Sequence, residues 1–447
     1  MSTHSISDIY FNRRLSDRTS IKDQPYSDQS AISLDLRWPE GTKLDPPTPE
    51  TPDLVCFSHL RWDFVYQRPQ HLLNRCAQAR RVFVVEEPIT VAGRNSWLDL
   101  SKRESGVWIV VPHMSGSLSE EVFTLSLQRL LNILFAEARI HQPIHWYYTP
   151  MAVQFTHHLP SSAVVYDCMD ELSAFKGAHP LLQTWESYLF KLADLVFTGG
   201  HSLYEAKRHQ HASVQAFPSS IEAAHFAQAR QSLPEPPDQA DIPHPRLGFY
   251  GVIDERMDLA LLDGIAQARP DWHLVMVGPI AKIDPASLPQ HANIHYLGGK
   301  SYSELPSYLA GWDVALLPFA RNESTRFISP TKTPEYLAAG KPVVSTSIRE
   351  VVRPYGDEKL VHIADTVPEF VAAIAAALDP DQTPSDWLDR VDARLAQTSW
   401  DLTWEAMNER IERAIATNAR NAIPAKTAPT KTKYPTAIAA NVDQLAI

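Results

Sequence analysis

The chain of 447 residues has only three cysteines, little glycine, no long hydrophobic run and a deficit of positive charge. Cys56, Cys76 and Cys168 have no C-x-x-C spacing and are too few for a disulfide framework, which fits a reducing compartment. No apolar run approaches the roughly 18–20 residues of a membrane span. Residues 1–20 also lack the apolar stretch of a secretory signal. We therefore expect a cytoplasmic protein.

The formal net charge of −11 argues against general binding to nucleic acid. Such binding needs a basic surface that releases counterions from the phosphate backbone. Apolar residues make up 44% of the chain and charged residues 21%, as in ordinary globular proteins. We expect a folded enzyme or binding protein with no nucleic-acid partner.

The chain has more than twice as many prolines as glycines, 35 against 16. Six, five and three prolines fall in residues 1–52, 234–245 and 418–447, where no periodic apolar pattern is present. These stretches predict a disordered lead-in, a stiff linker and a disordered tail. The length itself suggests two or three domains.

Short apolar runs alternate with helical patterns in residues 53–233 and again in residues 246–383. Runs such as 54–59 and 246–253 are apolar almost throughout, as strands are when helices cover both faces of a parallel sheet. The pattern predicts an α/β fold with two Rossmann-like αβα domains that face a cleft. Residues 384–417 are amphipathic and predict terminal helices.

The strand-to-helix turn with the most polar side chains lies in residues 316–344. A buried strand ends near Pro318, and a helix is expected to begin near Pro334 and to end at Gly340. The polar loop before this helix contains Arg326, Ser329, Thr331 and Lys332. Free N–H groups at a helix start attract anions, and the two cations suit a diphosphate.

Glu335 lies in the first turn of that helix. Its acceptor oxygens suit paired sugar hydroxyls such as those of a nucleotide ribose. An acidic residue in a first turn also stabilises any helix. These two interpretations stay open on physical grounds alone.

The run from Ser329 to Val344 reads S-P-T-K-x-x-E-Y-L-A-A-G-K-P-V-V. It resembles the donor-site signature of GT-B glycosyltransferases, in particular the large retaining superfamily that includes bacterial mannosyl- and glucosyltransferases. The resemblance covers residues 53–417 in organisation and is specific mainly at 313–345. The segment 57–72 is also similar to the opening loop of a subset of these enzymes.

The resemblance implies that Glu335 binds the nucleotide ribose and that the loop before it contacts the diphosphate. It further implies metal-independent transfer of a hexose from a nucleotide-diphosphate sugar, with retention of configuration, as in polysaccharide biosynthesis. The acceptor would be a glycan, a lipid-linked sugar or a small molecule. Lipid-linked acceptors would bring peripheral membrane contact, although no basic amphipathic helix stands out.

The sequence departs from the superfamily pattern at two positions. The superfamily often carries a glutamate eight positions before the ribose-binding one, and here that position is Phe327. The arginine expected after the first strand of the second domain is Val252, and Arg256 stands where a lysine is usual. Phosphate binding would then depend on Arg256 and Lys332, with help from Arg326.

Two glycines at strand ends complete the predicted donor site. Gly251 allows close approach of the backbone to a ligand, and Gly278 would frame the base. Simple packing and an ordinary turn explain these glycines equally well.

In the first domain, the loop after the first strand offers Arg61, Trp62, Asp63 and Arg68 as an acceptor-binding set. Trp62 would instead anchor the loop in the core if it were buried.

Asp170 follows another strand of the first domain and is our candidate for the catalytic group that faces the reacting sugar. A cluster of helix-capping or salt-bridging acids is the other explanation for this part of the chain.

The sequence predicts no metal site and no cofactor other than the nucleotide-sugar substrate. The G-x-G-x-x-G and P-loop patterns are absent, and the D-x-D at Asp379–Asp381 follows a helix instead of a strand. A nucleotide-sugar epimerase and a non-catalytic GT-B-like binding subunit remain alternatives to a transferase. Phe327 and Val252 favour the second of these.

Overall fold

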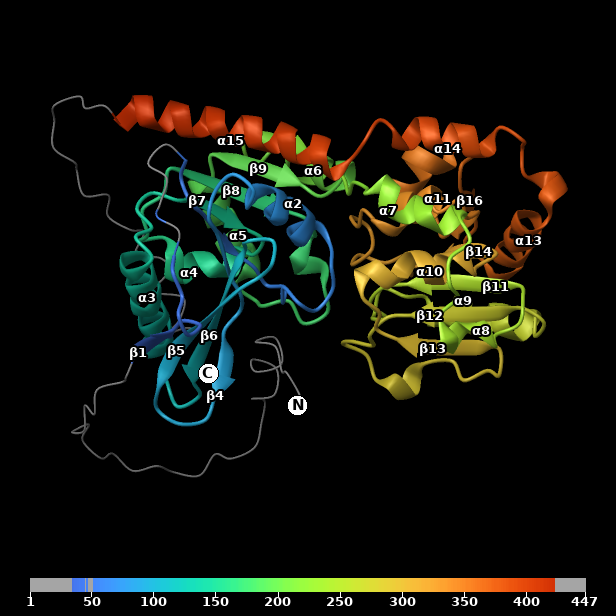
Figure 1. Cartoon of the computed structure of the whole chain (residues 1–447), viewed down its shortest axis with the longest axis horizontal. Coiled ribbons are helices and arrows are strands. Elements are labelled where there is room, and N and C mark those ends of the chain that lie inside the picture. Colours follow the sequence, from blue (N-terminus) through green and yellow to red (C-terminus); the bar gives the residue numbers. More distant parts are fainter. Residues whose placement is uncertain (1–33, 45, 47–50, 423–447) are drawn as a thin grey trace.

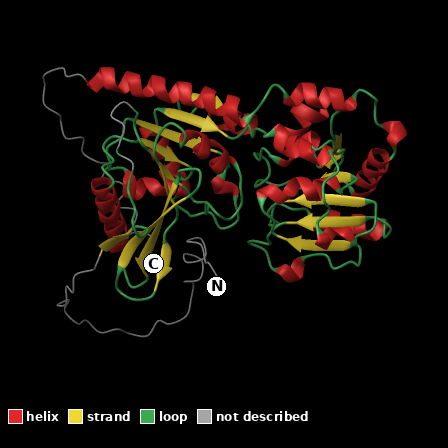
Figure 2. Cartoon of the chain, viewed as in Figure 1, coloured by secondary structure: helices red, strands yellow, loops and turns green. Residues whose placement is uncertain are grey.

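The computed structural model describes residues 34–44, 46 and 51–422. Two domains, each built on a mainly parallel sheet with helices on its faces, lie side by side (Figures 1 and 2). The predicted α/β fold is confirmed. Of the predicted disordered flanks, 1–52 and 418–447, residues 1–33, 45, 47–50 and 423–447 lie outside the described residues. The predicted start of the tail at residue 418 is wrong, because helix α15 (Trp400–Ala422) continues to residue 422.

The first sheet contains ten strands. They are β1 (Leu34–Arg37), β2 (Leu54–Phe57), β3 (Val82–Val85), β4 (Ile89–Val91), β5 (Ser96–Lys102), β6 (Trp108–Ser115), β7 (Ile144–Tyr147), β8 (Ala163–Cys168), β9 (Leu195–Thr198) and β10 (Val214–Ala216). Their order is β1-β5-β6-β3-β2-β7-β8-β9-β10, with β4 beside β6, and β5 pairs with β6 in the antiparallel sense. The prediction of a disordered lead-in up to residue 52 is wrong at β1, which pairs in parallel with β5.

The helices of the first domain cover both faces of this sheet. They are α2 (Arg68–Cys76), α3 (Glu120–Glu137), α4 (Val153–Thr156), α5 (Leu182–Leu192), α6 (His201–Lys207) and, from the end of the chain, α15 (Trp400–Ala422). Trp400, Met407 and Ile411 of α15 are buried in a core with Trp146 and Phe197 of the first sheet. The chain therefore returns to its first domain after completing the second, as the red helix in Figure 1 shows.

The second sheet has six parallel strands in the order β13-β12-β11-β14-β15-β16. They are β11 (Arg246–Tyr250), β12 (His273–Val277), β13 (Ile294–Gly298), β14 (Val314–Leu317), β15 (Val343–Ser345) and β16 (His362–Ile363). Its helices are α7 (Ala223–Ala227), α8 (Pro237–Ala240), α9 (Leu259–Ala268), α10 (Leu305–Ala310), α11 (Lys332–Ala338), α12 (Arg349–Val351), α13 (Val367–Leu378) and α14 (Trp387–Leu395). The strand order reverses between β11 and β14, and ligands of such sheets bind at the carboxyl ends of the strands at this point.

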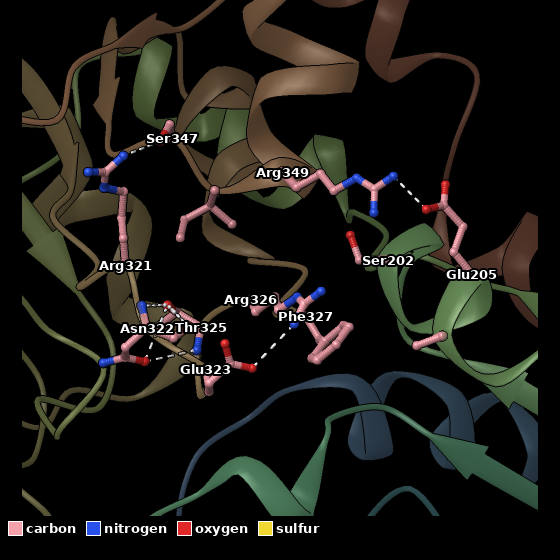
Figure 3. Close-up of a pocket in the computed structure, with 12 residues that line it drawn as sticks. Ser202, Glu205, Arg321, Asn322, Glu323, Thr325, Arg326, Phe327, Ser347 and Arg349 are labelled. Atoms are coloured by element: carbon pink, nitrogen blue, oxygen red, sulfur yellow. Dashed lines mark hydrogen bonds and ion pairs between the residues drawn. The ribbon is translucent and has the colours of Figure 1, made fainter.

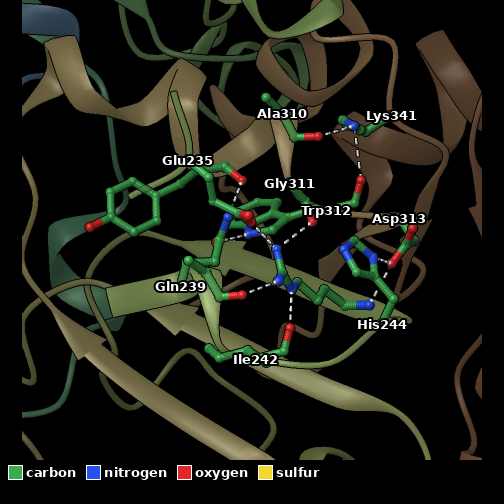
Figure 4. Close-up of polar contacts among 12 residues, drawn as sticks. Glu235, Gln239, Ile242, His244, Ala310, Gly311, Trp312, Asp313 and Lys341 are labelled. Atoms are coloured by element: carbon green, nitrogen blue, oxygen red, sulfur yellow. Dashed lines mark hydrogen bonds and ion pairs between the residues drawn. The ribbon is translucent and has the colours of Figure 1, made fainter. Parts of the chain in front are cut away.

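The predicted linker 234–245 does not space the domains apart. Its α8 packs on the second domain, where Gln239 is fully buried between the Tyr308 carbonyl and the Trp312 indole N–H (Figure 4). Ile242 also joins the second core, together with Ile221. The second domain therefore begins near residue 221, and the predicted boundary at 233 is wrong because the apolar side chains before it already pack there.

The two domains meet at Glu222. Its carboxylate accepts a hydrogen bond from Arg75 of α2 at 3.1 Å and one from the Tyr302 hydroxyl of the second domain at 3.0 Å. The Tyr302 ring stacks on Tyr66 of the first domain, with centroids 4.5 Å apart. His71 Nδ1 lies 3.5 Å from the carboxylate, and its interaction with Glu222 is the main reason that the pKa of Glu222 is lowered to about 2. The joint is thus an ionised carboxylate held by groups from both domains.

Gly248 in β11 gives a test of the second core. A Cβ at this position would lie 1.8 Å from the Trp312 ring, which is 2% exposed and cannot move aside. We expect Gly248→Ala to lower the free energy of unfolding by about 3 kcal/mol, measured by urea denaturation. Gly299→Ala is the matched control, because its Cβ would meet nothing closer than 3.7 Å. Equal stability of the two variants would contradict this packing.

Candidate functional site

The reversal point of the second sheet brings two glycines and Lys332 together. Gly251 follows β11 with φ 135°, and a Cβ there would lie 2.3 Å from Lys332 Cε. Gly278 follows β12 with φ 147°, and its Cβ would lie 1.8 Å from the Gly251 carbonyl oxygen. Both positions require glycine because of contacts within the chain itself. At Gly251 the close neighbour is therefore Lys332 of the chain itself, as in the packing explanation, and approach of a ligand to this glycine stays a prediction.

Half-buried Lys332 and buried Glu335 interact electrostatically at the start of α11. The helix begins at Lys332, two residues earlier than predicted. Burial lowers the pKa of Lys332 to about 8, against the opposing effect of Glu335. Burial raises the pKa of Glu335 to about 7, opposed by the hydrogen bond that the Tyr250 hydroxyl donates to Oε2. Lys332 contacts Gly251 and Glu335 contacts Tyr250, so both side chains lie at the carboxyl end of β11.

Arg256 faces the first domain across the cleft. Asp254 fixes its guanidinium through hydrogen bonds of 2.7–3.1 Å, and its Cζ lies 5.8 Å from the centroid of the Phe175 ring. Burial raises the pKa of Asp170 to about 6, against the effect of the Arg256 and Lys282 charges. Asp170 of the first domain and Arg256 of the second therefore interact electrostatically, and a catalytic role for Asp170 stays a prediction.

The other three residues predicted to bind the donor, Thr331, Ser329 and Arg326, lie in different places in the structure. Thr331 stays beside Glu335, whose backbone N–H donates to the Thr331 carbonyl at 3.4 Å. Ser329 instead joins the domains, because its Oγ accepts from the Ser219 amide at 3.2 Å and its carbonyl accepts from the Ser219 hydroxyl. Arg326 is 65% exposed and lines a different cavity from the one that Gly251 and Gly278 line.

A cavity of about 420 Å³ lies between the domains beside these strand ends. The second domain contributes Tyr250, Gly251 and Gly278 from the β11 and β12 ends, and also Lys300 and Tyr302. The first domain contributes the loop 62–66. The structure thus brings the predicted acceptor residues Trp62 and Asp63 into one cavity with the predicted donor glycines.

The acceptor loop is fixed by ion pairs. Trp62 is 8% exposed and donates its backbone N–H to Glu86 at 2.7 Å. Asp63 pairs with Arg103 at 2.6 Å, and Arg61 donates to Glu86 at 3.0 Å. Arg61 is therefore directed at its own domain instead of at a ligand, and the pairs hold the loop in place beside the cavity.

Arg68 does not bind an acceptor in this arrangement. It is 3% exposed, and Nε and Nη2 both donate to the Asp167 carboxylate at 2.9 Å. Its Nη1 donates to the Phe217 carbonyl at 2.8 Å. The prediction that Arg68 binds the acceptor is wrong. Its guanidinium instead donates hydrogen bonds that connect α2 to β8 and to the segment after β10.

Several residues at the cleft gave no signal in the sequence. Tyr250 ends a buried apolar strand and looks like core, although its hydroxyl holds Glu335. Lys282 is brought to the cleft only by the tertiary fold, and its Nζ lies 5.3 Å from the centroid of the Phe175 ring. Burial also raises the pKa of Glu87 to about 7, with Arg61 and Lys282 acting against it. Nothing in the spacing of these residues predicts that they meet.

Within residues 34–44, 46 and 51–422, no group of three or more His, Cys, Asp or Glu side chains is arranged to hold a metal ion. In that same part of the chain, no helix has the length and apolar character needed to cross a membrane.

Replacing Arg68 tests its structural role. Arg68→Met would leave the Asp167 carboxylate buried without a partner, and we expect a loss of about 3–5 kcal/mol in the free energy of unfolding. The double variant R68M/D167L removes both charges and is expected to recover much of that loss. Chemical denaturation measures both. An R68M protein of unchanged stability that binds acceptor weakly would restore the original prediction.

Comparison with known proteins finds sequence similarity to glycosyltransferases. Residues 244–380 match the sequence model of the family described as "Glycosyl transferases group 1". The "Putative teichuronic acid biosynthesis glycosyltransferase TuaH" of Bacillus subtilis (strain 168) is 27% identical over 237 residues. That match covers 48% of this chain and 58% of the relative, so the chain spans little more than half of the relative's length.

Solved structures resemble the described chain over both domains. Sucrose-phosphate synthase of Thermosynechococcus elongatus has a TM-score of 0.61 and 14% identity, covering 82% of this chain and 100% of that one. The E. coli trehalose-6-phosphate protein bound with UDP-2-fluoro glucose has a TM-score of 0.56 and 13% identity, covering 81% and 99%. An Anabaena protein in complex with UDP and glucose has a TM-score of 0.57 and 13% identity, also covering 81% and 99%. At these identities the likeness shows the fold.

The resemblance to GT-B glycosyltransferases found in the sequence is thus confirmed: the described chain has the GT-B fold, and residues 244–380 match the sequence model of the group 1 glycosyltransferases.

Proposed function

We propose that this protein is a glycosyltransferase that moves a hexose from a nucleotide-diphosphate sugar to a glycan, lipid-linked or small-molecule acceptor. One observation carries the proposal. Lys332, Arg256 and Glu335 of the second domain interact electrostatically at the reversal point of its sheet, and Asp170 of the first domain faces Arg256. A donor held there would have its sugar at the cleft.

The donor would lie with its diphosphate against Lys332 and Arg256. Asp254 orients the Arg256 guanidinium, and both cations are half-buried, so solvent screens their charges less than it would at the open surface. Glu335 would accept hydrogen bonds from the ribose hydroxyls, and the cavity walls at Gly278 and Tyr302 would frame the base. The relatives solved with UDP or a UDP-sugar support a nucleotide-sugar as donor.

Sugar transfer requires the nucleotide diphosphate to depart with its negative charge. Fixed cations stabilise charge that develops during a reaction, because they need no reorganisation at that moment. Lys332 and Arg256 would supply this stabilisation, so the proposed reaction needs no metal. Asp170 would lie beside the reacting sugar, and retention of anomeric configuration follows from the family resemblance. NMR of the product's anomeric proton tests the stereochemistry.

We further propose that the reaction takes place in the cytoplasm and serves polysaccharide synthesis. The three free, buried cysteines are compatible with a reducing compartment. The relative named for teichuronic acid biosynthesis supports a glycan acceptor. A lipid-linked acceptor would bring the cleft to a membrane surface. Liposome co-sedimentation measures that contact.

Variants of the donor site test the proposal. We expect Lys332→Ala and Glu335→Ala each to weaken UDP or GDP binding by about tenfold or more, because each removes a charge-assisted hydrogen bond. Asp170→Asn is expected to slow transfer by about 100-fold and to leave nucleotide binding unchanged. Lys191→Ala, on the exposed surface of α5, is the control for loss of a positive charge.

Calorimetry measures binding, and release of nucleotide from UDP- and GDP-sugars measures turnover. The donor assignment is wrong if neither K332A nor E335A weakens binding. Binding without transfer across an acceptor panel would favour the non-catalytic alternative. Conversion of the donor without an acceptor would favour an epimerase.

The pH dependence of binding tests Lys332 separately. Because burial lowers the pKa of Lys332 to about 8, the side chain loses its charge as pH rises through that value. We expect UDP affinity to fall by up to about tenfold for each pH unit above 8. Lys332→Arg keeps its charge and should abolish the decline. A wild-type affinity that is flat from pH 7 to pH 10 would remove Lys332 from the diphosphate site.

A further inference from the structure

A second cavity, of about 550 Å³, lies where α6 of the first domain faces the loops after β14 and β15 of the second (Figure 3). Its lining includes Glu205, Arg326, Phe327 and Arg349. None of its lining residues also lines the 420 Å³ cavity beside Gly251. The domain interface therefore holds a binding space that the nucleotide would leave unfilled.

Positive charge gathers around this cavity. Arg349 lines it, and Arg353 of the same segment pairs with the same carboxylate, Glu205 of α6. One carboxylate therefore serves two guanidinium groups. Arg321 lines the opposite side and pairs with Asp365 at 2.8 Å. Guanidinium groups in this arrangement retain donors for a further anion, since each has five N–H bonds.

Among the four arginines at this cavity, Arg326 has the longest and most exposed ion pair. Glu323 lies 3.4 Å away, and the two side chains are 65% and 76% exposed. Exposed ion pairs contribute little to stability, so an incoming carboxylate or phosphate can replace Glu323 at small cost. Arg326 is therefore free to bind a ligand anion.

Phe327 gives the cavity an aromatic face. Its half-buried ring packs against the first-domain core, and the Arg326 Cζ lies 5.2 Å from its centroid. An aromatic ring offers an apolar surface to the C–H bonds of a sugar. The neighbouring guanidinium can then bind an acidic substituent on the same sugar.

The identity of residue 327 matters for the charge balance. A glutamate is common at this position in the superfamily that the sequence resembles, and Phe327 removes that negative charge. Among the residues that line the cavity, Arg321, Arg326 and Arg349 stand against Glu205 and Glu323. The buried Glu350 carboxylate lies beside the cavity, but the N–H and hydroxyl of Ser202 already donate hydrogen bonds to it.

We propose that this cavity binds an acidic portion of the acceptor, a sugar that carries a carboxylate or phosphate group, with the anion on Arg326 and the sugar ring against Phe327. The proposal rests on the glycosyltransferase function proposed above, which requires an acceptor between the two domains. It moves Arg326 from the predicted donor site to an acceptor subsite.

Matched sugars test the proposal by calorimetry on the full chain. Cellobiouronic acid and cellobiose differ by one carboxylate, and glucose 6-phosphate and glucose differ by one phosphate. We expect at least one acidic sugar to bind about tenfold tighter than its neutral counterpart, and the advantage to shrink as NaCl is raised. Comparing the two pairs distinguishes a carboxylate from a phosphate. Acidic sugars that bind no tighter than neutral ones overturn the proposal.

Variants locate the site. Arg326→Ala is expected to remove the tenfold preference for the acidic sugar. Arg413→Ala, which removes an equally exposed and ion-paired arginine on α15, is expected to retain it. Phe327→Ala should weaken the acidic and the neutral sugar alike. An R326A protein that behaves as R413A does, or that loses UDP affinity instead, overturns the proposal.

The two proposals fail differently. If the glycosyltransferase function is wrong, the wild-type chain binds neither UDP nor GDP. If only the acceptor subsite is wrong, nucleotide binding is intact and the preference for acidic sugars is missing.

Discussion

The Glu222 carboxylate fixes the distance between the two domains. It receives hydrogen bonds from Arg75 on one side and from Tyr302 on the other, and its lowered pKa keeps it ionised across the physiological range. Tyr302 in turn stacks on Tyr66, and both rings line the 420 Å³ cavity. The width of that cavity therefore depends on a carboxylate that touches neither proposed substrate. Glu350 reinforces the same arrangement, because this buried carboxylate accepts hydrogen bonds from the start of α6 across the interface.

The reversal of strand order in the second sheet divides the interface into two halves. The ends of β11, β12 and β13 line one cavity, and the loops after β14 and β15 line the other. Lys332 and Glu335 stand at the division, at the start of the helix between β14 and β15. A nucleotide on one side and an acceptor on the other would meet at these two residues and at Asp170. The topology of the sheet thus separates two cavities, one for each of the proposed substrates.

Sequence reasoning found the features that are local. The apolar strands of both sheets and the turn around Glu335 depend on neighbouring residues, and the structure has them where they were expected. Arg68 shows where such reasoning ends, because its partner Asp167 is 99 residues away and only the fold brings the two together. Arg326 shows the same limit at a smaller scale. It lies six residues from Lys332 in the chain, yet the loop between them turns it into a different cavity. The strand β1 was missed because its short alternating pattern gains meaning only from pairing with β5.

The return of α15 to the first domain has a consequence for synthesis of the chain. Trp400, Met407 and Ile411 complete a core whose other members, such as Trp146 and Phe197, leave the ribosome some 200 residues earlier. Until α15 is made, only α2 covers that apolar face, through Leu72, Leu73 and Cys76. The first domain therefore matures only after the second has been translated, and a chaperone that shields apolar surface would be needed most during that interval.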